Sequence, residues 1–358
     1  MISVALVFAL KFASPVPDVK YQQPQIASLG DQIGVTFASG DQIFYSFSTN
    51  DGQSFSRPST LPIAGKLSLG RHRGPRIAYQ AGNVVISAVV GAKGKGEDGD
   101  ILVWTSADNG KSWTKPVKVN DAPGSAREGL HAMASGNGMV VAVWLDLRDK
   151  GTRLYGSKSI DGGATWSKNF LVYDSPDGTI CQCCHPTALI GPGGVIHVMF
   201  RNALGGSRDM YWVRSENGGI KWEPAKKLGL ETWKLNGCPM DGGGLAISGD
   251  GTAYSIWRRE KKIYVARPDG KESELGEGKD PVIAAALNNE IYAVWTGVDG
   301  SLETRSRRNN TVRKVAASGA HPQIVFSGRS VLTFFEQDNG IAMETLESRD
   351  PQPSTGSR

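Results

Sequence analysis

The chain has 358 residues, of which 45 are glycine, and 39% of its residues are hydrophobic. This composition suits many short strands joined by tight turns and excludes a disordered chain. The net charge of +5 is mildly basic, but no Lys/Arg run is interleaved with aromatic residues on one element, so no nucleic-acid-binding module is expected.

The N-terminal segment is apolar over residues 1–10 and then reaches Lys11, Pro15 and Pro17. It is too short to span a membrane. We interpret residues 1–17 as a signal peptide, which predicts a secreted or periplasmic protein. The alternative is a β-strand that closes the fold. No later stretch is a transmembrane candidate.

Seven similar units follow, each with two β-branched and aromatic strands separated by a glycine-containing turn. A third strand follows the pair in each unit. The first strands are expected at 24–27, 75–78, 131–134, 186–189, 244–247, 281–284 and 322–325, and the second at 34–37, 84–90, 140–144, 195–200, 253–257, 291–295 and 331–335.

Four antiparallel strands per unit, repeated radially, are typical of a β-propeller. We therefore predict an all-β, single-domain propeller over residues 18–348, with seven blades favoured and six as the alternative. Residues 349–358 are expected to form a flexible tail. The seventh unit has no obvious fourth strand, and the N-terminal segment is a candidate for it.

One phrase occurs four times, at residues 48–55, 106–113, 159–166 and 215–222. Its pattern is Ser-x-Asp/Asn-x-Gly-x-Ser/Thr-Trp/Phe, with Lys221 replacing the hydroxyl in the last copy. Asp or Asn beside Gly favours a tight turn, because Gly adopts positive φ and the short polar side chain bonds to the backbone. The phrase predicts a repeated hairpin in the first four units.

This phrase is the Asp box, so the chain resembles the sialidase (neuraminidase) superfamily of Asp-box, or BNR-repeat, β-propellers. It is most similar to uncharacterised secreted bacterial sialidase-like proteins. The resemblance implies a glycoside hydrolase acting on an acidic, sialic-acid-like glycan, held by three arginines. Members use a Tyr nucleophile paired with a Glu, and an Asp as acid/base. This chain has Tyr21-Gln22-Gln23-Pro24 where the family's first arginine stands, and no tyrosine starts a late inner strand.

Residues just before each first strand and just after each second strand share one face of a propeller near its axis. The positions before the first strands are occupied by Gln23, Gly74, His131, His185, Gly242, Asp280 and His321. Three of the five histidines occupy this position, and His72 lies close to it. We therefore predict His131, His185 and His321 as ligand-binding residues.

Arginines near the same face are expected to bind an anionic group on the ligand, because guanidinium forks match carboxylates. They are Arg76, Arg148, Arg201 and Arg258. Hydrolysis of a glycosidic bond needs two carboxylates at one site. The candidates are Asp241, Asp146, Asp280 and Glu128, with Asp241 favoured as the acid/base.

All four cysteines precede the fourth and fifth units. Cys181 and Cys238 take equivalent positions, which predicts a disulfide between them, with Cys183 and Cys184 either bonded to each other or free. The rival interpretation is a Cu or Zn site formed by Cys183 or Cys184 with Cys238, His185, His131 and Met240. Under the disulfide interpretation no cofactor is expected.

Three functions remain open from the sequence: a glycosidase, a non-catalytic propeller that binds a glycan or protein, and a metal-dependent enzyme that uses the His and Cys residues. A monomer is expected.

Overall fold

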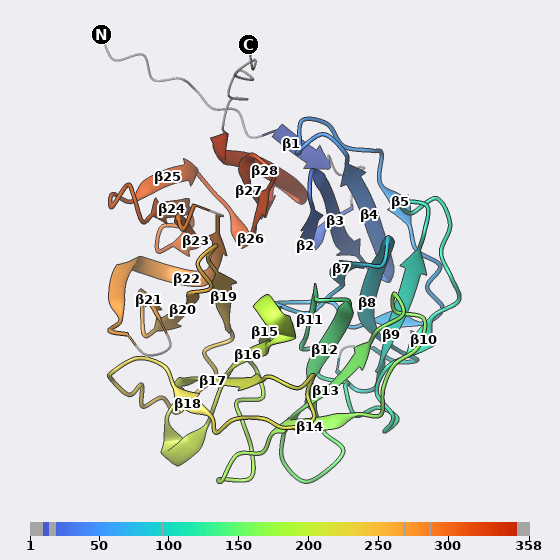
Figure 1. Ribbon diagram of the computed structural model, residues 1–358, viewed down its shortest axis with the longest axis horizontal. Helices are drawn as coiled ribbons and strands as arrows, with labels where there is room; N and C mark the ends of the chain where they lie inside the picture. Colours follow the sequence, from blue (N-terminus) through green and yellow to red (C-terminus); the bar gives the residue numbers. More distant parts are fainter. Residues whose placement is uncertain (1–9, 14–18, 95, 268–269, 287, 349–358) are drawn as a thin grey trace, which may run out of the picture.

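The computed structural model describes residues 10–13, 19–94, 96–267, 270–286 and 288–348, in which antiparallel sheets form a ring (Figure 1). Two short 3-10 turns, η1 (Pro192–Gly194) and η2 (Leu204–Gly206), are the helical segments of these residues. Within the same ranges, no helix has the length and apolar character needed to cross a membrane.

Five sheets are discrete blades. Four of them have four strands, and one has five because β6 and β7 both pair with β8. Their strands are β2 (Gln22–Leu29), β3 (Gln32–Ser39), β4 (Gln42–Ser48) and β5 (Ser59–Thr60); β6 (Lys66–Leu67), β7 (Arg76–Gln80), β8 (Asn83–Gly91), β9 (Asp100–Ser106) and β10 (Val117–Lys118); β11 (His131–Gly136), β12 (Met139–Asp146), β13 (Arg153–Ser159) and β14 (Phe170–Tyr173); β15 (Thr187–Ile190), β16 (Ile196–Arg201), β17 (Met210–Ser215) and β18 (Lys226–Lys227); and β26 (Ala320–Ser327), β27 (Ser330–Gln337), β28 (Gly340–Ser348) and β1 (Leu10–Ala13).

The sixth sheet is continuous over seven strands. Its central strand, β22, is 13 residues long; its first half pairs with β21 and its second half pairs with β23. The seven predicted strand pairs are present, but seven or six separate blades are not, because the fifth and sixth units share β22. The strands of this sheet are β19 (Gly243–Ile247), β20 (Ala253–Arg259), β21 (Lys262–Ala266), β22 (Ser273–Ala285), β23 (Ile291–Gly297), β24 (Leu302–Ser306) and β25 (Arg313–Ala316).

The innermost strands form a closed ring around the axis (Figure 1). Each contacts the next, in the order β2, β7, β11, β15, β19, β22, β26 and back to β2. The second strands are apolar and buried along most of their length, as β12 illustrates. Both faces of such a strand are covered by neighbouring sheets, so its sequence is a continuous run of apolar residues.

The N-terminal segment contributes to closure. β1 pairs antiparallel with β28 and supplies the fourth strand of the last blade. This pairing, at residues 10–13, matches the alternative expectation that the N-terminal segment supplies the missing strand of the seventh unit. Residues 1–9 and 14–18 of the predicted signal peptide, and the predicted flexible tail at 349–358, lie outside the described residues.

The four repeated phrases form matching turns between third and fourth strands, on the outer part of each blade. In the first, the Gly52 N–H donates to Ser48 Oγ (3.0 Å) and the Ser54 N–H donates to Asn50 Oδ1 (3.0 Å). The same bonds recur in the other three copies. The turns are thus part of the scaffold and lie away from the axis.

Candidate functional site

Three inner strands, β2, β22 and β26, share the same local distortion. Gln23, Asp280 and His321 each precede a proline and adopt positive φ, at 55°, 55° and 49°. The strand pairing shifts register at each of the three positions. Proline disfavours the right-handed helical conformation in the residue before it, and left-handed backbone costs a non-glycine residue about 1–3 kcal/mol. Such outliers cluster at functional sites, which focuses attention on these three side chains.

Asp280 is the centre of the polar cluster at this face. Its side chain is 3% exposed and carries two hydrogen bonds to Oδ1, from Arg71 Nη2 at 3.0 Å and from His72 Nε2 at 3.0 Å. His321 Nδ1 lies 3.9 Å from Oδ2. Burial opposes ionisation, but the bond from His72 and the charge of Arg71 outweigh it and hold the Asp280 pKa well below its usual range.

Three imidazoles surround this carboxylate. The His72 ring lies 4.3 Å from that of His185 and 5.1 Å from that of His321, measured between centroids. Burial and the neighbouring His72 lower the His321 pKa to about 4. Burial also lowers the pKa of His185, whose Nδ1 accepts a hydrogen bond from the Gly242 N–H at 3.3 Å. Both rings are therefore neutral near pH 7, so each has one ring N–H that can donate a hydrogen bond and one ring nitrogen that can accept one.

A second carboxylate, missed in the sequence, belongs to the same face. Glu336 lies near the end of β27, and its Oε1 accepts hydrogen bonds from Gln23, from the backbone N–H at 2.8 Å and from Nε2 at 3.2 Å. Burial raises the Glu336 pKa, and the charge of Asp280 raises it further. The rule that selects residues at second-strand ends would have identified Glu336 if applied to the seventh unit. We call Asp280, Glu336, His72, His185 and His321 the axial cluster.

A cavity of about 260 Å³ lies among all seven innermost strands, and His72 and His185 are part of its lining. Arg76 also borders it. A larger cavity of about 570 Å³ lies between the fifth and sixth units, bordered by Tyr254, Arg267 and Arg305. None of the predicted site residues lines that larger cavity. The smaller cavity on the axis is therefore the better candidate for a functional site.

The other predicted carboxylates are engaged by arginines. Asp241 is fully buried between Arg201 (3.3 Å) and Arg258 (2.6 Å). Asp146 accepts from Trp144 Nε1 at 2.7 Å and from Arg148 at 2.8 Å. Glu128 pairs with Arg73 at 3.3 Å. Asp280 is therefore the predicted catalytic carboxylate that the structure brings to the axial cluster.

The predicted arginines bond mainly to the protein itself. Arg201 is 1% exposed and donates to backbone carbonyls as well as to Asp241. Arg76 is also buried and donates to the carbonyls of His131 and His72. Their proposed contact with a ligand stays a prediction. Arg71 and Arg73, which the sequence analysis did not select, keep side chains 32% and 22% exposed near this face.

Unlike His185 and His321, His131 is not part of the axial cluster, because it bonds to a different partner. It is fully buried, and its Nε2 lies 2.9 Å from Ser87 Oγ. Burial lowers its pKa to about 3. These contacts fit a structural role between β8 and β11.

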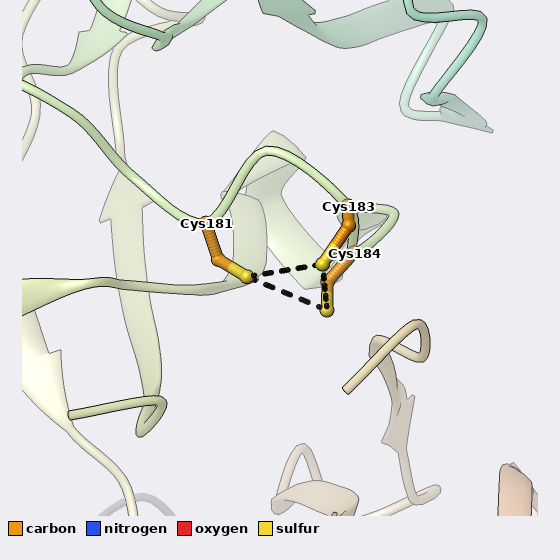
Figure 2. Close-up of side chains that lie close together, drawn as sticks. All are labelled: Cys181, Cys183 and Cys184. Carbon is orange, nitrogen blue, oxygen red and sulfur yellow. Dashed lines mark hydrogen bonds between the residues drawn. The ribbon is translucent and has the colours of Figure 1, made fainter. Parts of the chain in front are cut away.

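The predicted Cys181–Cys238 disulfide is wrong, because all four cysteines are free, and of the two states expected for Cys183 and Cys184 the structure has the free thiols. Cys238 is exposed, whereas Cys181 and Cys184 are buried. Figure 2 shows that Cys181, Cys183 and Cys184 instead point toward one another from a single turn before β15. Burial raises the pKa of the Cys184 thiol to about 12.

Among the residues that the structure describes, two groups of side chains have the geometry to hold a metal ion. The ligand atoms of Cys181, Cys183 and Cys184 lie within 4.8 Å of one another, and so do those of His72, Asp280 and His321. The predicted alternative metal ligands, His131, His185, Cys184 and Cys238, do not form one group in the described residues. Cys184 lies with the other two thiols, and His131 bonds to Ser87.

The model of the BNR repeat-like domain matches residues 43–247, more than half of the chain, so the chain belongs to this family. It is the family of sialidase-like propellers that the repeated turns predict.

Solved structures show the same fold at low sequence identity. An α-L-arabinanase of Penicillium chrysogenum, complexed with arabinobiose, is similar with a TM-score of 0.52 and 13% identity, over 95% of this chain and 96% of that chain. A GH93 α-L-arabinofuranosidase of Fusarium graminearum gives 0.55 and 14%, over 92% and 93%. A Hadza microbial sialidase gives 0.52 and 13%, over 90% and 74%. No curated protein sequence matches the chain.

Proposed function

We propose that this protein is a glycoside hydrolase whose reaction takes place at the axial cluster. The observation that supports the proposal is the presence of two carboxylates, Asp280 and Glu336, on one face with pKa values displaced in opposite directions. Paired titratable groups whose environments separate their pKa values are the usual source of acid and base roles in one site.

The roles follow from the two environments. Glycosidic cleavage requires a protonated carboxylic acid for the leaving oxygen and an ionised carboxylate that acts as nucleophile or base. Glu336, with its raised pKa, is the general acid, and its Oε2 has no hydrogen bond among the residues that the structure describes. Asp280 stays ionised and is the second carboxylate.

For the substrate we propose a glycan that carries a carboxylate. Arg71 donates to Asp280 through Nη2, and its side chain is 32% exposed, so this arginine can be reached from solvent beside the cluster. Arg73 lies two residues further along and is 22% exposed. Guanidinium groups bind carboxylates with directional paired hydrogen bonds. Two of the similar structures contain arabinobiose, so a neutral pentoside is the substrate against which an acidic glycan should be compared.

The axial cluster also favours a second candidate, a metal-dependent enzyme. Two imidazoles and a carboxylate with ligand atoms within 4.8 Å form a ligand set suited to a divalent transition metal. In that case activity would be lost on treatment with a chelator and restored by metal. Activity that is unaffected by chelation assigns the cluster to acid/base chemistry.

The test is turnover of chromogenic sialosides and arabinofuranosides by the pure protein, with and without chelator. Glu336→Gln and Asp280→Asn should each lower turnover by about 10²-fold or more while the protein remains folded. Glu216→Gln is the matched control, because that carboxylate is 63% exposed on the outer part of the fourth blade. Retained glycan binding without turnover of any glycoside would instead identify a binding propeller.

A further inference from the structure

Three thiols converge on one point near the start of β15, outside the axial cluster. The sulfur atoms are 3.6 Å apart for Cys181 and Cys183, 3.7 Å for Cys181 and Cys184, and 3.8 Å for Cys183 and Cys184 (Figure 2). The turn at 182–184 folds the chain back, so that residues two and three positions apart face each other. The three contacts are nearly equal, and no pair is closer to a disulfide than the others.

These spacings match a set of thiolates around one ion. A point equidistant from three sulfurs separated by 3.6–3.8 Å lies about 2.1 Å from each. A small displacement of the ion from the sulfur plane brings this value to the metal–thiolate distance of about 2.3 Å. The existing backbone therefore suffices, without rearrangement of the turn.

The surroundings select a soft cation. The sulfur atoms are the donors of the group, and thiolates select Cu⁺ and Zn²⁺ over harder ions. Two of the three cysteines are buried, Cys181 at 4% and Cys184 at 1% exposure, so an ion bound there is protected from water.

The number of available ligands favours Cu⁺ over Zn²⁺ at this site. Structural zinc takes four ligands, almost always in a tetrahedron. The fourth cysteine, Cys238, lies near Cys183 but is exposed and outside the group of three.

We propose that Cys181, Cys183 and Cys184 bind one Cu⁺ ion as a three-thiolate site. Binding forms three copper–sulfur bonds and releases the three thiol protons to solvent, with no change of oxidation state. The site does not depend on the proposed glycosidase activity, because none of its sulfurs belongs to the axial cluster.

The experiment titrates the full chain, purified and reduced under anaerobic conditions, with Cu⁺ in competition with a chromophoric Cu⁺ chelator. The wild type should bind about one ion per chain, and X-ray absorption at the copper edge should report sulfur ligation. Cys183→Ser and Cys184→Ser should each lose the ion. Cys238→Ser is the matched control and should retain it.

Circular dichroism establishes that each variant is folded. Cys183 is only partly buried, so its replacement provides the test even if Cys184→Ser does not fold. Three results would overturn the proposal: no Cu⁺ uptake by the reduced wild type, loss of the ion in Cys238→Ser, or preferential binding of one Zn²⁺ that requires all four cysteines. Because the readout is metal content, failure here is distinguishable from a lack of glycosidase activity.

Discussion

At Asp280, burial and hydrogen bonding act in opposite directions on one carboxyl group. Desolvation disfavours the charge, whereas His72 and Arg71 stabilise it, and the net effect lowers the pKa. At Glu336 burial dominates and the pKa rises. Two carboxyl groups of similar intrinsic acidity thereby have pKa values displaced in opposite directions at the same face, and this difference is the basis of their proposed roles.

Glu336→Gln should lower turnover about 10²–10⁴-fold, the usual contribution of a general acid. In the wild type, activity should fall as pH rises through the raised pKa of Glu336, because the acid is then deprotonated. A pH–rate profile measures both effects. If the alkaline limb is the same in the variant, Glu336 is not the acid.

Asp280 also predicts a pH dependence of stability. Its folded-state pKa is lowered, so its stabilising contribution is present above the unfolded pKa of about 3.9 and is lost as pH falls through the folded pKa. Asp280→Asn should therefore reduce the free energy of unfolding near pH 7 by on the order of 2 kcal/mol. Urea unfolding at several pH values should show this difference shrinking toward acid pH. A difference that is independent of pH would contradict the assignment.

Among the elements, the repeated turns join neighbouring blades as well as strands. A Cβ added at Gly110 would lie 2.5 Å from Cδ1 of Tyr45, which belongs to the preceding blade. The glycines of the other three turns likewise abut the preceding blade. The glycine in each phrase is thus needed for its positive φ and for close packing between blades.

Gly110→Ala should lower the free energy of unfolding by about 2–4 kcal/mol, because it adds overpacking to an unfavourable backbone conformation. Gly82→Ala is the matched control. Its φ of 79° is close to the 81° of Gly110, but no atom lies within 4 Å of the added Cβ. Denaturant unfolding of the two variants isolates the packing component, and equal losses would show that packing between blades contributes nothing.

At the scale of the whole molecule, closure joins the two ends of the chain. β1 pairs with β28 in the blade that also contacts the first unit, through β26 and β2. Fourth strands leave only short edges exposed in a propeller. The N-terminal segment therefore has a structural role that its apolar composition alone did not distinguish from a signal peptide.

Deletion of residues 1–13 should reduce the free energy of unfolding by about 2–3 kcal/mol, from the loss of a few ladder hydrogen bonds and of the cover on β28. Deletion of residues 1–9 retains β1 and is the control. The midpoint of thermal unfolding reports the loss of stability in each of the two deletion variants. Identical midpoints for the two deletions and the full chain would favour the interpretation of residues 1–17 as a removable leader.

Local signals were sufficient to predict the propeller. The turn phrase, the seven strand pairs and the equivalent positions before inner strands depend on nearest neighbours and on side-chain period, and the structure confirms the first two. The same positional rule correctly placed Asp280, His185 and His321 at one face. It could not separate them from His131, because the partner of His131, Ser87, lies 44 residues away and is recognised only in three dimensions.

Long-range pairing explains the remaining differences. Asp241, Arg201 and Arg258 have the composition of a ligand site, but the two arginines pair with Asp241, because buried charges need partners. The three thiols of Cys181, Cys183 and Cys184 meet through the path of one turn, which the positions of the cysteines along the chain did not reveal. Periodicity and turn chemistry are local and could be deduced from the chain, whereas the partner of each charge, ring and thiol depended on how the blades close around the axis.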